Sequence, residues 1–252
     1  MMEMPMFRTL ILAVLLMPGA ALAETALVAV AANYAGAAQA QALAFGSASG
    51  HEIALTTGST GKLYAQILAA APFDILLAAD ATTPAKLEAA GAGVAGSRFT
   101  YALGALVLWS LDPGRIGADP GAALRDPGLR HLAIANPELA PYGTAAQQAL
   151  QALGEWEALQ GRIVMGENVG QAHALVATGA AEAGFVALSA APPEAGGSRW
   201  LVPQALFAPI RQDALLLAHG AENPAAQAFL DWLKTSEAQA INAAFGYGVA
   251  AP

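Results

Sequence analysis

The sequence predicts an α/β fold in which short strands and helices alternate along the chain. Apolar runs of strand length occur at residues 27–32, 53–57 and 75–79, and a helical pattern follows each of them. The third run is apolar on both faces, as expected for a strand buried inside a parallel sheet. Because strands linked by helices in this order form right-handed crossovers, the order of elements alone predicts a parallel sheet.

In the first half of the chain, Gly, Pro and Asp residues mark the ends of the predicted elements. Glycines on both sides of Ser59 allow a tight turn before a helix, and Pro72 ends that helix because proline cannot continue it. Asp80 begins the turn after the third strand. The elements predicted here are strand 27–32, helix 34–45 with Asn33 as its N-cap, strand 53–57, helix 62–71, strand 75–79 and a short helix 84–91.

The second half contains a long apolar strand at 101–109 and a further predicted strand at 211–218, which are the candidates for strands that join two lobes. A loop rich in Gly, Pro and Asp covers 112–128. The other predicted elements are strand 131–135, a helix ending near 153, strand 163–165, helix 170–178 started by Asn168, strand 183–188, helix 223–235 and helix 237–245.

Residues 1–23 have the pattern of a secretory signal peptide. Arg8 supplies the positive charge, residues 10–17 the apolar segment, and Ala21 and Ala23 a small-residue site that predicts cleavage after Ala23. The apolar segment is too short for a membrane-spanning helix. The chain has no cysteine, so neither a disulfide nor a lipid-anchored cysteine is expected. Together with the signal peptide, this predicts a periplasmic protein.

The composition restricts the partners. Net charge is −8, with 11 Lys and Arg against 19 Asp and Glu, so no basic patch for nucleic acid is expected. Although 56% of residues are hydrophobic, Gly, Pro or charged residues interrupt every apolar run after residue 23. Removing 23 of 252 residues leaves 229, enough for one large domain or two lobes.

Four junctions share one pattern, in which a strand ends in a turn that leads directly into a helix. Helix N-termini present N–H groups without intrahelical partners and favour anions. Such junctions meet at the carboxyl ends of strands, so we expect an anion site where they converge. Each junction alone could merely cap its helix, and the fourth could act only through its backbone; the four are Asn33, Ser59, Tyr142 and Val169.

Enzymatic and metal-binding functions have little support in the sequence. Ser59 has no evident general base, because His51, His131, His173 and His219 stand far apart. No spacing of His, Met or carboxylate residues suits zinc, copper or iron. Neither a catalytic site nor a cofactor is therefore expected.

Several segments resemble one known family. They are AANY (31–34), GSTGKLYAQI (58–67) with PFDILLAAD (72–80), NPELAPYGTAAQQAL (136–150), GENVGQAHALV (166–176) and FLDWLKTSEAQAINAAFGYG (229–248). With these segments the chain resembles the periplasmic molybdate-binding proteins of ABC transporters. The resemblance implies a type II periplasmic binding fold, with two α/β lobes joined by crossing strands around an oxyanion cleft. It places lobe I at 24–103 and 212–252 and lobe II at 104–211.

The resemblance also implies the ligand and its contacts. Asn33 and Ser59 would donate from the first lobe, and the backbones of Tyr142 and Val169 from the second, with Ala32 and Thr60 as further candidates. The Tyr142 phenol is also a candidate donor. Molybdate or tungstate would be held through oxygen, without direct metal ligation, by a monomer that delivers it to a membrane permease. Many members carry a further tyrosine where this chain has Ala187. Sulfate, another oxyanion, or an enzyme on the same fold are the alternatives.

Three charged residues lie near the Ser59 turn. Asp74 begins the third strand and is expected at the sheet end away from the ligand, whereas Asp80 could reach the cleft rim. Both are expected to stabilise turns, since a carboxylate would repel an oxyanion. Lys62 is expected to point to solvent or to the lobe surface.

Overall fold

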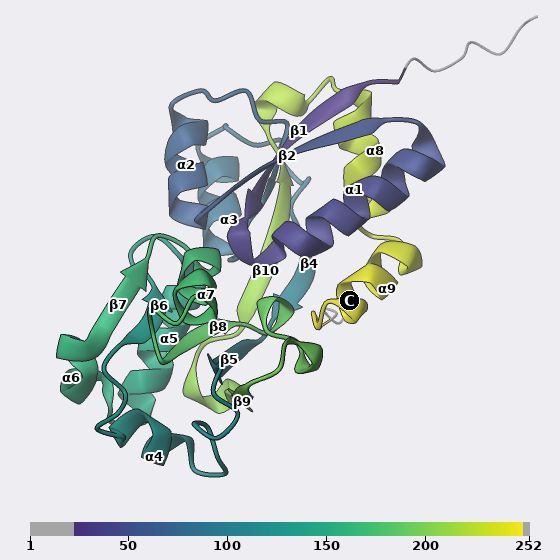
Figure 1. Cartoon of the computed structure of the whole chain (residues 1–252). Helices are drawn as coiled ribbons and strands as arrows, with labels where there is room; N and C mark the ends of the chain where they lie inside the picture. Colours follow the sequence, from purple (N-terminus) through teal and green to yellow (C-terminus); the bar gives the residue numbers. More distant parts are fainter. Residues whose placement is uncertain (1–22, 249–252) are drawn as a thin grey trace, which may run out of the picture.

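The computed structural model describes residues 23–248, and the predicted signal peptide, except for Ala23, lies outside them. The chain forms two α/β lobes, each built on a five-stranded sheet (Figure 1). The two-lobe fold predicted for this sequence is confirmed.

Lobe I is the unit built on the sheet β2-β1-β3-β10-β4. In this sheet β1 pairs parallel with β2 and β3, as predicted, whereas β10 runs antiparallel between β3 and β4. Its strands are β1 (Thr25–Ala31), β2 (Glu52–Gly58), β3 (Ile75–Leu77), β4 (Phe99–Gly104) and β10 (Ile210–Leu216). Its helices are α1 (Ala35–Ser49), α2 (Thr60–Leu68), α3 (Thr82–Ala89), α8 (Pro224–Trp232) and α9 (Ser236–Ala244).

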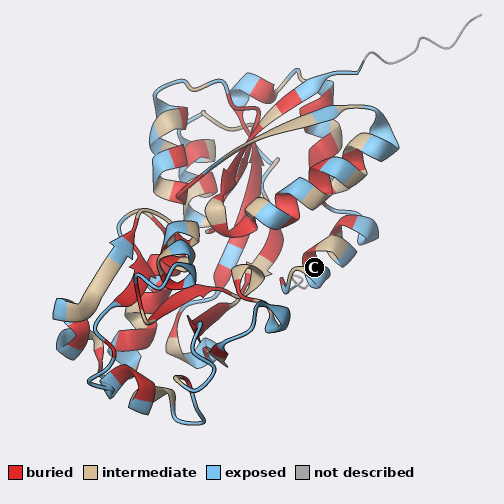
Figure 2. Cartoon of the chain, in the orientation of Figure 1, coloured by how far each residue is buried: buried red, intermediate tan, exposed pale blue. Residues whose placement is uncertain are grey.

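The two faces of the lobe I sheet are covered by different helices. Phe45 of α1 and Phe229 of α8 belong to one apolar cluster, which includes alternate residues of β1 and β3. Leu63 of α2 and Leu87 of α3 belong to the cluster on the opposite face. Figure 2 shows the strands as the buried centre of this lobe. This double coverage explains why these strands are apolar on both faces.

Lobe II is the unit built on the sheet β7-β6-β8-β5-β9. In it β6 pairs parallel with β7 and β8, and β5 runs antiparallel to β8 and β9. Its strands are β5 (Leu106–Ser110), β6 (Leu132–Ala135), β7 (Ile163–Gly166), β8 (Ala183–Ala187) and β9 (Ser198–Leu201). Its helices are α4 (Pro120–Arg125), α5 (Pro141–Ala152), α6 (Trp156–Leu159) and α7 (Val169–Ala177).

The chain crosses between the lobes beside β4 and β10, which we call the hinge strands. The single strand predicted at 101–109 is wrong, because β4 ends at Gly104 and β5 begins at Leu106 in the other sheet. A continuous apolar run cannot show that its pairing partner changes at Ala105. The sequence analysis also missed β9, α4 and α6, which are all short.

None of the helices among residues 23–248 is long and apolar enough to cross a membrane.

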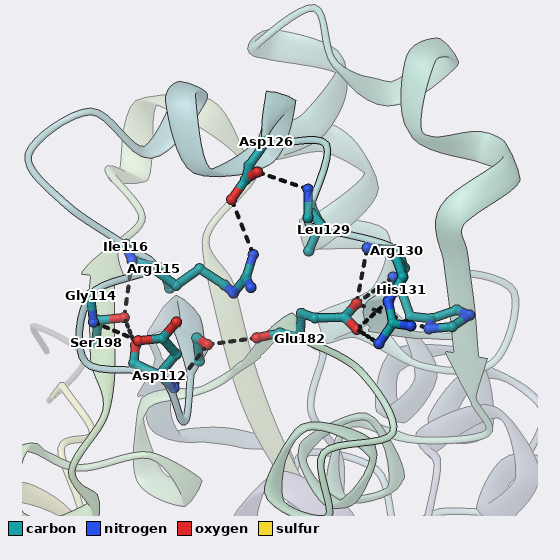
Figure 3. Close-up of polar contacts among 12 residues, drawn as sticks. Asp112, Gly114, Arg115, Ile116, Asp126, Leu129, Arg130, His131, Glu182 and Ser198 are labelled. Atoms are coloured by element: carbon teal, nitrogen blue, oxygen red, sulfur yellow. Dashed lines mark hydrogen bonds and ion pairs between the residues drawn. The ribbon is translucent and has the colours of Figure 1, made fainter.

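A polar network holds the amino ends of the lobe II strands (Figure 3). Glu182, just before β8, accepts hydrogen bonds from the backbone N–H groups of Arg130 and His131 at 3.0 and 2.7 Å. The Arg130 guanidinium adds an ion pair at 2.9 Å. Burial opposes ionisation, but these donors lower the pKa of Glu182 from 4.5 to about 2. The network therefore joins β6 to β8 through one carboxylate.

Replacing Glu182 by Gln is expected to lower Tm at pH 7 by about 2–4 °C. A carboxyl group whose pKa falls on folding stabilises the folded state above its unfolded pKa. That contribution is lost as pH falls from about 4.5 towards 2, so wild type and variant should converge there. Thermal unfolding from pH 7 to 3 tests this, with the exposed Glu157→Gln as control. A difference in Tm that does not change with pH would contradict it.

Candidate functional site

The four predicted junctions converge in one pocket between the lobes. The turn after β1 and the turn after β2 come from lobe I, and the starts of α5 and α7 come from lobe II. We call this the interlobe pocket; it is lined by Ala31, Ala32, Asn33, Gly58, Ser59, Thr60, Ala79, Ala140, Pro141, Tyr142, Asn168 and Val169. None of these residues carries a charge.

Backbone N–H groups from both lobes are free at the pocket. Within the described part of the chain, no protein acceptor bonds the N–H groups of Asn33, Ser59, Tyr142 and Val169. Three of them lie at the starts of α2, α5 and α7, where the helix dipole is positive. The pocket can therefore attract an anion without a cation.

Ser59 is the N-cap of α2, as predicted, but its side chain does not cap the helix. Its hydroxyl is buried, with the residue only 2% exposed, and bonds no protein atom among residues 23–248. A buried polar group without a partner costs about 1–3 kcal/mol. This hydroxyl therefore has hydrogen-bonding capacity that the protein does not use.

Asn33 lies at the predicted place but does not cap the following helix. A 3-10 turn (Ala32–Tyr34) separates β1 from α1, and Asn33 is the middle residue of this turn. Its amide donates to Gln212 Oε1 at 2.8 Å and to the Tyr247 hydroxyl at 3.2 Å. The N-cap prediction is wrong because these distant partners hold the amide. What remains free at this junction is the backbone N–H.

Tyr142 extends its ring from the pocket towards the hinge strands. Its hydroxyl is buried and has no hydrogen-bond partner within the described chain. It lies beside Gly104, where an added Cβ would come within 2.3 Å of it. Burial raises the pKa of this phenol well above 10, so it stays protonated and can donate.

The two further candidates differ in what they offer the pocket. The Thr60 hydroxyl already accepts a hydrogen bond from the Ala79 backbone at 3.0 Å, so it serves to fix the end of β3. Ala32 can contribute only its backbone. Val169 likewise presents no polar side chain, and Asn168, the N-cap of α7, bonds the backbone of Gln171 at 3.0 Å.

Residues 26–248 match the family of bacterial extracellular solute-binding proteins. The chain belongs to this family. It is 51% identical over 233 residues to the molybdate-binding protein ModA of Azotobacter vinelandii, covering 91% of this chain and 92% of that one. It is 47% identical to ModA of Rhodobacter capsulatus, covering 90% and 89%. The solved periplasmic molybdate-binding protein of Azotobacter vinelandii superposes with a TM-score of 0.86 at 42% identity, covering 90% of this chain and all of that one.

This solute-binding protein has its two lobes in contact around the pocket. Gly61 N–H of lobe I donates to the Leu139 carbonyl of lobe II at 2.9 Å. Lys62 lies at the lobe surface, as predicted, and pairs there with Glu167 of lobe II at 2.8 Å, a partner that was not predicted. Its side chain is 53% exposed and pairs outside the lining of the pocket. The first turn of α2 therefore contacts lobe II at two points beside the pocket.

Sequence reasoning missed a buried polar group behind the pocket. Tyr247 donates to the Asn33 carbonyl at 2.6 Å, and Ser189 of lobe II donates to the same carbonyl at 3.0 Å. Gln212, fully buried on β10, accepts from Asn33 and, at 3.2 Å, from Tyr101. Nothing in the sequence indicated this burial, because Gln212 stands between the charged residues Arg211 and Asp213.

The remaining predicted residues have structural contacts. Asp74 accepts from the Leu27 backbone at 2.7 Å and pairs with His219 at 3.0 Å, at the sheet end away from the pocket. The Asp80 carboxylate accepts a hydrogen bond from the Thr83 backbone N–H at 2.6 Å. His173 stacks on Trp109 with ring centroids 5.0 Å apart. In the described chain, no group of three His, Cys, Asp or Glu residues could hold a metal ion.

Proposed function

We propose that this protein captures molybdate in the interlobe pocket and delivers it to the permease of an ABC importer. The observation that carries the proposal is the buried Ser59 hydroxyl, which has no partner among residues 23–248 and lies among free N–H groups from both lobes. Relatives at 51% and 47% identity carry the name molybdate-binding protein, and this supports the choice of ion.

The chemistry of the lining favours a fully deprotonated dianion. Free groups at Asn33, Ser59, Tyr142 and Val169 are donors, with Ala32 and Thr60 beside them. Monohydrogen phosphate carries a proton that needs an acceptor, and no carboxylate lines the pocket to provide one. Tungstate resembles molybdate in shape and charge, so we propose that both bind. Either metal would be held through its oxygens, without direct ligation or a cofactor.

We further propose how the chain is organised for this role. Lobe I would comprise 24–103 and 212–252, and lobe II 104–211. The lobe I sheet extends slightly past these limits, since β4 ends at Gly104 and β10 begins at Ile210. The mature protein would begin after Ala23 and act in the periplasm as a monomer. Binding without catalysis agrees with the solute-binding family.

A panel of oxyanions tests the proposal by thermal unfolding. Ligand at a thousandfold excess over Kd stabilises by about 4 kcal/mol, which raises Tm by roughly 8–16 °C for a chain of this size. We expect this shift with molybdate and tungstate, and little shift with sulfate or phosphate at equal concentration. A sulfate shift as large as that of molybdate would contradict the choice of ion and leave only the oxyanion class.

A further inference from the structure

We propose that Gly104 and Gln212 form a seat on the hinge strands into which the Tyr142 phenol must fit for the lobes to close. Tyr142 belongs to α5 of lobe II, whereas Gly104 ends β4 and Gln212 lies on β10. The seat is thus made by lobe I at the crossing points, and its occupant comes from lobe II. This inference rests on the proposed function and names residues that position the ligand donors.

The first observation is the lack of space at Gly104. A Cβ there would lie 2.3 Å from the Tyr142 hydroxyl and 2.8 Å from Gln212 Nε2. The Tyr142 hydroxyl ends a rigid ring and cannot move aside as a flexible chain would. The φ angle of Gly104 is not positive, so the backbone does not require glycine. Glycine is needed here for the close approach of the phenol.

The second observation is polar. The Tyr142 hydroxyl and Gln212 Nε2 are both buried without a hydrogen-bond partner in the described chain, and both lie within 3 Å of the same hypothetical Cβ. The other end of the Gln212 amide accepts from Asn33 at 2.8 Å. Gln212 is therefore bonded at one end to a pocket residue of lobe I, and its other end lies near the phenol of a pocket residue of lobe II.

The position of the seat makes small displacements matter. Tyr142 presents its backbone N–H to the pocket and its phenol to the hinge strands. Because the ring is rigid, a displacement of the phenol also displaces the N–H. Gly104 is next to the crossing point at Ala105, whereas Ser59 follows β2 at the sheet edge far from the hinge strands. When an added group holds the lobes apart near the hinge axis, the separation of the lobes grows with distance from that axis. An added methyl group at Gly104 should thus separate Ser59 from the lobe II donors.

The experiment compares Gly104→Ala with the same substitution in a Tyr142→Phe background. We expect Gly104→Ala to weaken molybdate binding by about 10-fold or more in calorimetric titration. Small-angle scattering should show less compaction on adding molybdate than wild type shows. Removing the hydroxyl relieves the closest contact, so Gly104→Ala should cost less affinity in the Tyr142→Phe background than in wild type. Tm without ligand should fall by a similar amount in both backgrounds, because the added methyl group also contacts Gln212 and Ile210, which lie on lobe I with Gly104.

Two results would overturn the seat. One is wild-type affinity and compaction in Gly104→Ala. The other is an affinity loss of the same size in both backgrounds, which would show that the phenol is not the group that the added methyl group displaces. Failure of the proposed function would give a different result, because the wild-type protein itself would then not bind molybdate. The same comparison would be made with the oxyanion that does shift its Tm.

Discussion

Replacing Ser59 by Ala is expected to weaken molybdate binding by about 10- to 100-fold. The hydroxyl is buried, has no partner in the part of the chain that the structure describes, and lies among free N–H groups of both lobes. A hydrogen bond to a charged group contributes about 1.5–3 kcal/mol, and each 1.4 kcal/mol corresponds to tenfold in Kd. The unliganded protein should not lose stability, because the Ser59 side chain makes no capping bond. Calorimetric titration and thermal unfolding without ligand measure the two effects.

Lys62→Ala is the matched comparison, since Lys62 lies on the same turn of α2. Its ammonium pairs with Glu167 at 2.8 Å and is half exposed, and exposed ion pairs contribute at most about 1 kcal/mol. We therefore expect a smaller loss of affinity than for Ser59→Ala, and one that shrinks as salt increases. If Lys62→Ala abolishes binding while Ser59→Ala leaves it intact, a direct ion pair holds the anion.

The junctions were predictable because their signals are local. A strand pattern that ends in Gly58 and Ser59 and continues as a helix specifies a turn at a carboxyl strand end, whatever surrounds it. Parallel strands bring such ends together at one edge of a sheet. The sequence therefore predicted which turns would meet, and the structure brings all four to one pocket.

The side-chain partners were not predictable, because they are distant in sequence. Asn33 and Gln212 are 179 residues apart, and no periodicity relates them. The Asn33 amide therefore looked like a cap, the commonest role for asparagine before a helix. The partner of Lys62 is likewise in the other lobe. The break at Ala105 was not predictable either, because the strands on both sides of it are apolar.

Gly143→Ala is expected to lower both the stability of the protein and its affinity for molybdate. Gly143 is in the first turn of that helix, next to Tyr142, and packs directly on the end of β6. A Cβ there would come within 2.3 Å of the Ala135 carbonyl oxygen and 2.7 Å of the Asn136 backbone. Backbone atoms in a buried strand cannot yield as a side-chain tip can, so the helix start must move.

This displacement would carry the free N–H of Tyr142 away from the donors of lobe I. Overpacking of this kind costs about 1–3 kcal/mol of stability, and more where backbone blocks relaxation. We expect a lower urea midpoint without ligand and at least about tenfold weaker molybdate binding. Gly161→Ala is the control, because a Cβ there meets no atom within 4 Å. Wild-type stability and affinity in Gly143→Ala would show that α5 can shift without loss, and that its N–H need not be held against β6.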